Sequence, residues 1–429
     1  MTATTTTAAP RETTPTVLAP IVWRWPITYA VLTLIALVLF ALLPDGAQET
    51  TFQLSRQSDL IAIPNFALPT GLTNWVLSAL MVAATLYATR RAVARAKVPV
   101  WLPIVFGTAF VLCFLVWVGA GRATVIPLTT LLQGALALSV PLVFGALSGV
   151  LCERSGIVNI AIEGQLLGGA FLAAVIGSLT SSAYLGMIAA PIAGALVGVL
   201  LAFFSVRYWV DQIIVGVVLN VLVVGLTSFL FSTVLTENAE LLNARQRLPN
   251  LPIPLLSEIP VIGPVLFNQN LLVYLMYTAV VVLQIFLFRS RWGLRMRSVG
   301  EHPKAADTVG IKVNRTRVLN TILGGAVAGL GGAFFTVGSG LAFGKEMSAG
   351  QGYIALAAMI LGKWNPTGAV AAALLFGFSK NLGNVLSTIG APVPSEFLLM
   401  LPYVVTIIAV AGLVGRVRAP AAENIPYIK

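Results

Sequence analysis

Charged side chains are scarce in this sequence. Asp, Glu, Lys and Arg together make up 10% of its 429 residues, whereas an ordinary soluble domain carries roughly 25% charged residues. Hydrophobic residues account for 58%, and the mean hydropathy is +0.92. This composition excludes a soluble multidomain enzyme.

Cysteine and histidine are almost absent as well. The two cysteines, Cys113 and Cys152, lie inside or at the edge of apolar runs, so neither a disulfide framework nor a thiolate metal site is implied. The single histidine, His302, excludes a two-histidine metal site. An intramembrane enzyme would need paired catalytic acids or a metal triad. The apolar runs hold almost no acidic residues, so the sequence disfavours catalysis by this chain.

Long apolar runs are what the sequence does contain. They are about 17 to 23 residues long, the length that a helix needs to cross the hydrocarbon core of a bilayer. The sequence therefore predicts an all-α fold, a polytopic transmembrane helical bundle with about 10 to 12 membrane segments. Two of these, Tyr353–Leu361 and Gly368–Phe378, are too short to span comfortably and are expected to be broken or tilted helices. The other predicted segments are residues 27–43, 72–88, 100–120, 128–151, 160–176, 185–205, 213–235, 271–288, 318–337 and 397–414.

The order of these segments predicts four regions and two long loops. The tail at residues 1–26 is rich in Thr, Ala and Pro, and we expect it to be disordered. A membrane extension (27–127), a membrane core (128–415) and a second tail (416–429) follow. Within the core, the loop 236–270 is expected outside, where it could form a cap or a docking surface, and the loop 289–317 is expected inside.

The basic residues set the expected orientation. The chain has 26 Lys and Arg against 15 Asp and Glu, a net charge of +11. In a membrane protein such an excess collects in cytoplasmic loops and fixes the topology, so it does not imply a nucleic-acid partner. Alternation through all the segments puts most of the basic residues on one side, and it predicts that both termini are cytoplasmic.

The loop 289–317 carries the densest charge and the clearest helix signals. Pro303 suits the first turn of a short helix, Glu301 precedes it at the positive helix end, and Gly310 can terminate it. Such an amphipathic helix could present a ridge to a cytoplasmic partner. The alternative is a basic loop that only fixes the topology.

Four separated stretches resemble one family. The stretch "SRWGLRMRSVGEHPKAADTVGIKVNRTRVLNTILGGAVAGLGGAFF" begins at Ser290. It resembles the glycine-centred coupling loop and following helix of permeases in bacterial ABC importers for sugars, branched-chain amino acids and nucleosides. The stretches "SGVLCERSGIVNIAIEGQLLGGAF" and "ILGKWNPTGAVAAALLFGF", with the ending "RAPAAENIPYIK", are similar to the shorter permease subunit of nucleoside ABC importers. The resemblance covers roughly residues 128–429, and the extension 27–127 exceeds what the family leads one to expect.

The resemblance implies a mechanism and a set of partners. The chain would move a nucleoside inward across a bacterial cytoplasmic membrane by alternating access. The loop helix would dock on a cytoplasmic ABC ATPase that binds ATP-Mg, while this chain binds no cofactor. The other partners would be a second related permease subunit and an external substrate-binding protein or lipoprotein. The implied coupling residues are Gly300, Glu301, Ala305, Ala306 and Gly310.

Four polar residues in apolar segments are candidates for the substrate pathway, namely Asn159, Glu163, Gln165 and Asn220. A carboxylate at membrane depth costs about 2.5 to 3.5 kcal/mol on insertion scales, so Glu163 is expected to face a cavity or a partner. The alternative is that Asn159 caps its helix and Glu163 complements the helix dipole near the interface. Asn220 could bind the substrate or form a helix-to-helix hydrogen bond.

The sequence alone leaves other functions open. The substrate could be a simple sugar or a branched-chain amino acid. The chain could also be an ion-coupled secondary transporter, but such a protein would need carboxylates at mid-membrane, and only Glu163 comes near that depth. The stretch "GSGLAFGKE" at Gly338–Glu346 does not complete a phosphate-binding loop, because Ser339 and Glu346 occupy places where that motif needs Gly and Ser or Thr. If ATP drives this protein, a separate chain binds it.

Overall fold

The computed structural model describes residues 21–43, 47–55, 63–122, 125–390 and 418–428, with scattered positions between 394 and 407. The chain forms two compact units, one of residues 1–48 and 69–120 and the other of residues 49–68 and 121–429. In the described part of the chain, ten helices are long and apolar enough to cross a membrane. The chain is therefore a multi-pass membrane protein.

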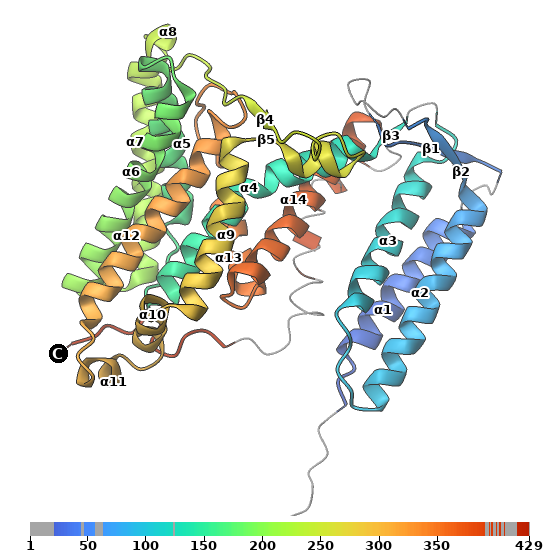
Figure 1. The fold of residues 1–429 in the computed structure, drawn as a ribbon, viewed down its shortest axis with the longest axis horizontal. Helices are drawn as coiled ribbons and strands as arrows, with labels where there is room; N and C mark the ends of the chain where they lie inside the picture. The colour runs from blue at the N-terminus through green and yellow to red at the C-terminus, as the bar shows by residue number, and fades with distance from the viewer. Residues whose placement is uncertain are drawn as a thin grey trace, which may run out of the picture. The chain divides into compact units, whose positions relative to one another are not determined.

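The described part of the first unit is built from long helices that lie side by side (Figure 1). Helix α1 (Arg24–Ile35) continues into the π-helical segment η1 (Ala36–Leu42), and α2 (Thr70–Val93) and α3 (Trp101–Gly119) follow. Its core is aromatic: the rings of Tyr29 and Phe106 stack with their centroids 4.1 Å apart. The predicted segments in this region are confirmed.

The second unit has a long central helix, α4 (Leu128–Glu153), with other helices packed around it (Figure 1). Helices α12, α13 and α14 lie directly against α4, and α5 and α6 pack together and against α12. Because neighbouring helices cover α4 on all sides, almost every residue in its second half is buried. The other helices of this bundle are α5 (Ile162–Leu179), α6 (Ala183–Ala202), α7 (Gln212–Leu230), α9 (Leu271–Arg289), α12 (Val313–Gly332), the short α13 (Gln351–Leu361) and α14 (Pro366–Thr388).

Short elements connect these helices. The segments η2 (Phe203–Arg207), η3 (Phe231–Leu235) and η5 (Ala333–Phe335) extend α6, α7 and α12. Strands β1 (Glu49–Gln53), β2 (Phe66–Pro69) and β3 (Ile126–Pro127) form a sheet in the order β2-β1-β3, in which Phe52 lies opposite Ile126. The loop 236–270 holds α8 (Ala239–Leu242), η4 (Gly263–Phe267) and the antiparallel pair of β4 (Asn250–Pro252) and β5 (Asn268–Asn270).

One predicted segment needs correction. The run Gly368–Phe378 is not a broken helix but part of α14, which has 23 residues. Asn365 caps the start of α14 by accepting a hydrogen bond from Thr367 N. The helix continues beyond Phe378 through polar residues, and one of these, Asn381, is satisfied inside the bundle because it donates to Leu131 O on α4 at 2.7 Å. The other doubtful run is confirmed as the short helix α13. The predicted segment 397–414 lies largely outside the described residues.

Small residues let α6 and α12 approach closely. A Cβ atom at Gly194 would overlap the carbonyl oxygen of Gly325, and one at Gly329 would overlap Ala190 O. The spacing of Gly325 and Gly329 therefore serves helix packing, because small residues four positions apart let two helices approach closely.

We expect Gly194→Leu to abolish a stably folded protein, because overpacking costs about 1 to 3 kcal/mol even where side chains can shift, and here the obstacle is backbone. Thermal unfolding of the detergent-purified protein measures this loss. The matched control is Gly225→Leu on α7, where a Cβ would meet no atom of another described segment within 4 Å. Equal melting of the two variants would contradict the packing described.

Candidate functional site

The loop between α9 and α12 folds into two short helices, α10 (Arg291–Glu301) and α11 (Pro303–Thr308). Ser290 caps α10 by accepting a hydrogen bond from Gly293 N at 3.1 Å. Pro303 occupies the first turn of α11, as the sequence predicts, and Gly310 follows in a left-handed conformation with φ +84°. The local signals predicted only the helix that begins at Pro303, and α10 was missed although its apolar residues recur at helical spacing.

The five coupling candidates have two different environments. Gly300 and Ala306 are buried, whereas Glu301, Ala305 and Gly310 are exposed. A Cβ at Gly300 would overlap the carbonyl oxygen of Arg154, so only glycine allows this contact. Ala306 packs against Val299 and Val313 in a small core of its own. The exposed residues of α11 are therefore the ones available to another protein.

The end of the chain, residues 418–428, lies against this loop. Arg317 is 1% exposed and donates hydrogen bonds to Ile425 O at 2.8 Å and to Ala422 O at 3.2 Å. Ala422 N in turn donates to Gly300 O at 2.8 Å, and Ala421 N donates to the Glu301 carboxylate at 3.3 Å. The tail therefore fastens α10 to the first turns of α12.

The same tail reaches the start of α7. Asn424 donates to the Asp211 carboxylate at 3.2 Å, and Asp211 caps α7 through Ile213 N and Ile214 N. The backbone N–H of Ile214 and the Asn424 amide hold the pKa of Asp211 below its usual value. The carboxyl of Glu423, in contrast, has a raised pKa because it is buried. Sequence reasoning used the tail only for resemblance, because contacts so distant along the chain leave no local pattern.

Arg154, just after α4, joins the loop to the turn between α13 and α14. Its Nε donates to Trp364 O at 3.0 Å and its Nη2 donates to Lys363 O at 3.3 Å. Burial lowers the pKa of Arg154, and the nearby Glu301 carboxylate opposes that shift. Glu153 accepts a hydrogen bond from Trp364 Nε1 at 2.5 Å. The loop, the end of α4 and the α13–α14 turn therefore form one continuous set of contacts.

Helix α13 leads from that turn into the bundle. Its 11 residues cover about 16 Å at 1.5 Å per residue, about half the thickness of a hydrocarbon core of about 30 Å. The N-terminal end of α13 therefore lies well inside the membrane segments. Broken helices whose ends meet inside a bundle are a recurrent way of building transport sites.

A cavity of about 330 Å³ lies beside that end of α13. This volume falls in the range of about 300 to 1,000 Å³ that is usual for small-ligand sites. Of the predicted pathway residues, the structure brings Glu163 and Asn220 to this cavity and leaves Asn159 and Gln165 outside its lining. The residues that line it are Glu163, Asn220, Val221, Val224, Glu346, Ser348, Ala349, Gly350 and Tyr353.

Glu163 holds the start of α13. It lies in the first turn of α5, as predicted, and its carboxylate accepts hydrogen bonds from Ser348 Oγ at 2.6 Å, Gly350 N at 2.8 Å and Gly352 N at 2.6 Å. The carboxylate thus complements the positive end of the neighbouring helix α13. This satisfies a charge that would be costly inside the bundle.

Asn159 does not cap α5, which corrects that alternative. The helix starts at Ile162 after Ala161, and Asn159 donates instead to Ser148 Oγ and to Gln165 Oε1, both at 3.0 Å. Asn159 and Gln165 are fully buried, and they tie the segment before α5 to α4. Their environment is that of a packed polar cluster.

Asn220 forms helix-to-helix hydrogen bonds, which is one of the two roles predicted for it from the sequence. Its Oδ1 accepts from Gly164 N at 2.8 Å, and its Nδ2 donates to Ile160 O at 2.9 Å and to Tyr353 Oη at 3.1 Å. The amide joins α7 to the start of α5 and to α13. Sequence reasoning missed Ser348 and Tyr353. The signal that could have found Ser348 is the turn "SAGQG", in which Gly350 has φ +77°.

We expect Asn220→Leu to lower the thermal stability of the protein. The substitution leaves Gly164 N and Ile160 O buried without a partner, and each such group costs about 1 to 3 kcal/mol. Melting of the purified variant in detergent measures this effect, with Val217→Leu on the exposed side of α7 as control. Identical melting of Asn220→Leu and the native chain would show that these hydrogen bonds contribute little.

The amino-acid sequence of the second unit is similar to the sequences of known proteins. A family model described as "Branched-chain amino acid transport system / permease component" matches residues 131–410. The guanosine ABC transporter permease protein NupQ of Bacillus subtilis is 37% identical over 311 residues, which are 70% of this chain and 97% of that protein. The nucleoside ABC transporter permease protein NupC of Lactococcus lactis is 39% identical over 311 residues, 70% of this chain and 98% of that protein.

A more distant relative comes from the same Bacillus strain. The guanosine ABC transporter permease protein NupP is 27% identical over 294 residues, 66% of this chain and 83% of that protein. Such relatives therefore occur as pairs of permease subunits in one organism. The comparison with solved structures gives no match. Residues 1–130 lie outside the family match.

Proposed function

Because the chain belongs to the family of branched-chain amino acid transport system permease components, we propose that it is the membrane-spanning subunit of an ATP-driven importer of nucleosides. The observation that carries this proposal is the identity of 37% and 39% to a guanosine and a nucleoside permease over almost their whole length. The chain does no covalent chemistry in this role. A separate ATPase holds the ATP-Mg.

The chemistry of the 330 Å³ cavity supports a nucleoside as substrate. Tyr353 is 49% exposed, so its ring is available to stack on a base. Glu346 is exposed at the same cavity and can accept hydrogen bonds from sugar hydroxyls. A branched-chain amino acid offers neither a base to stack nor sugar hydroxyls. We therefore favour the nucleoside over the other substrates of the family.

Alternating access requires a link between the ATPase and this cavity. We propose that the junction of α10 and α11 docks on the ATPase through two exposed residues, Glu301 at the end of α10 and Ala305 on α11. Movement of α11 would pass through the contact of Gly300 with Arg154 to the α13–α14 turn, and along α13 to Glu163. The energy difference between inward and outward states then depends on whether the ATPase sites are closed.

The remaining partners and the orientation follow from the same assignment. A second related permease subunit would complete the translocation path, in keeping with the paired relatives. An external binding protein or lipoprotein would deliver the nucleoside. The basic loop containing α10 and α11, and both termini, would face the cytoplasm of a bacterial cell, because basic residues are retained on that side.

Competition uptake tests the proposed substrate. Cells that express the complete transporter take up labelled guanosine, and unlabelled nucleosides, ribose and leucine are added in excess. We expect nucleosides to abolish uptake of the label, and ribose and leucine to leave it unchanged. Uptake of labelled ribose or leucine in place of guanosine would overturn the nucleoside assignment.

A further inference from the structure

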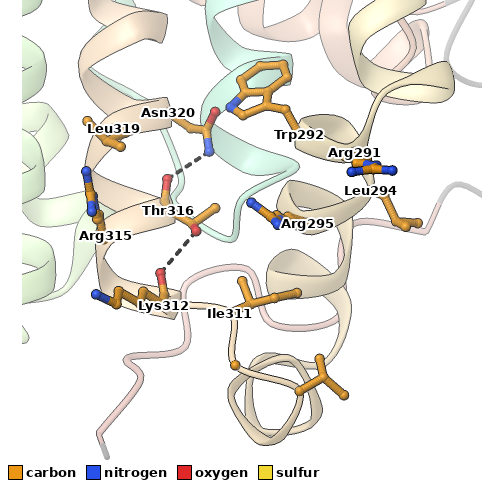
Figure 2. A pocket seen from close by; sticks show the side chains of 12 residues that line it. Arg291, Trp292, Leu294, Arg295, Ile311, Lys312, Arg315, Thr316, Leu319 and Asn320 are labelled. Carbon is orange, nitrogen blue, oxygen red and sulfur yellow. Dashed lines mark hydrogen bonds between the residues drawn. The ribbon is translucent and has the colours of Figure 1, made fainter.

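A second, larger cavity lies between α10 and α12. Its volume is about 710 Å³, and it opens between Arg295 of α10 and the first turns of α12 (Figure 2). This cavity is separate from the 330 Å³ cavity, because the two share no lining residue. The proposed transport mechanism does not use it.

The lining of this cavity is strongly basic. Arg291 and Arg295 contribute from α10, and Lys312 and Arg315 contribute from the start of α12. Among the described residues that line it, none is acidic. A cavity with this charge attracts an anion, and the attraction falls with ionic strength for exposed groups.

One buried acceptor in the cavity lacks a donor. Asn320 is 1% exposed, and its Nδ2 donates to Thr316 O at 2.7 Å. Its Oδ1 has no hydrogen-bond partner among the described residues. Figure 2 shows this amide beside the indole of Trp292, and both residues line the cavity. Because a buried oxygen without a donor is unfavourable, the site suits a ligand that brings a hydroxyl group.

The cavity lies where membrane helices meet water. Arg291 lies two residues after the end of α9, and Lys312 directly precedes α12. Both of these helices are long enough to cross the bilayer. Leu294 is 62% and Leu319 54% exposed at its rim. Tryptophan is enriched at this level of a membrane, and basic pockets between membrane helices suit anionic lipid headgroups.

We propose that this cavity binds the headgroup of an anionic phospholipid that carries a free hydroxyl, such as phosphatidylglycerol. The phosphodiester faces Arg295, a headgroup hydroxyl donates to Asn320 Oδ1, and the acyl chains run along Leu319 and the apolar surface of α12. The lipid then anchors α10 to the bilayer. This inference does not depend on the proposed function, since it requires only that α9 and α12 cross the membrane.

A lipid-stabilisation assay on the full chain tests the proposal. The purified protein is depleted of lipid in detergent, and its melting is followed while phosphatidylglycerol, phosphatidic acid, phosphatidylcholine or glycerol 3-phosphate is added. We expect phosphatidylglycerol to raise the melting temperature and phosphatidylcholine to have no effect. Phosphatidic acid should act more weakly because it lacks the headgroup hydroxyl, and soluble glycerol 3-phosphate should not stabilise.

Three variants assign the effect to this cavity. Arg295→Gln should weaken the apparent affinity for phosphatidylglycerol at least about fivefold, since it removes a cation from the phosphate site. Asn320→Leu should abolish the preference for phosphatidylglycerol over phosphatidic acid. Arg289→Gln, an exposed neighbour outside the cavity lining, is the control and should behave as the native chain.

Two results would overturn the proposal. Equal stabilisation by glycerol 3-phosphate would mean that the cavity takes a soluble phosphate ester and not a lipid. An unchanged lipid response in Arg295→Gln and Asn320→Leu would place lipid binding elsewhere on the chain. Because Arg295 is exposed, its substitution should not prevent folding, so a negative result cannot be attributed to an unfolded variant.

Discussion

Ala305→Trp is expected to reduce ATP-driven uptake by at least about tenfold, which corresponds to about 1.4 kcal/mol. Ala305 is exposed on α11, next to Ala306, which anchors the helix in its small core. A bulky side chain at Ala305 leaves that core intact and obstructs the surface that we propose for ATPase docking. Uptake and ATP hydrolysis of the reconstituted complex are measured together, and we expect hydrolysis to continue without transport.

The control for this variant is Asn314→Trp, an exposed position in the first turn of α12. It places the same large side chain in the same loop region but not on α11. We expect it to retain uptake and assembly. If Ala305→Trp transports as well as Asn314→Trp, α11 is not the coupling element.

Glu163→Gln is expected to destabilise the protein by about 3 kcal/mol or more. Hydrogen bonds to a charged group contribute about 1.5 to 3 kcal/mol each, and the carboxylate accepts them from Ser348 Oγ, Gly350 N and Gly352 N. A glutamine would turn one acceptor into a donor that faces other donors. The start of α13 would then separate from α5, and the melting temperature would fall.

Glu346→Gln is the matched control, because it makes the same chemical change at the same cavity on an exposed side chain. Thermal unfolding should be unchanged in this variant. Should Glu163→Gln melt like Glu346→Gln, Glu163 would not be the residue that holds α13. Uptake measured in parallel reports separately on the proposed role of Glu346 in binding sugar hydroxyls.

The membrane helices were predictable because hydropathy and length alone decide them. The failure at α14 has a physical cause: Lys380 and Asn381 end the apolar run in the sequence, but Asn381 is paired with Leu131 O on α4. A partner so distant in sequence cannot be inferred from local composition. The loop helix α11 was predictable because Pro303 and Gly310 are local signals.

The site was only partly predictable for the same reason. A polar residue in an apolar run is a signal that singles out Glu163 and Asn220, and both line the cavity. The same signal singles out Asn159, which instead forms a hydrogen bond with Ser148 in a buried polar cluster. Tyr353 carries no polarity signal of this kind. Arg317 holds the tail through backbone carbonyl groups. Every residue has such a group, so no residue type in the sequence marks these partners.

The most direct test of the central claim is uptake into proteoliposomes. The chain is reconstituted with its second permease subunit, with and without the ATPase, and labelled nucleoside is offered together with the external binding protein. We predict accumulation against a gradient only when the ATPase and ATP-Mg are present. Accumulation by the permease subunits alone, without any nucleoside triphosphate, would contradict the account.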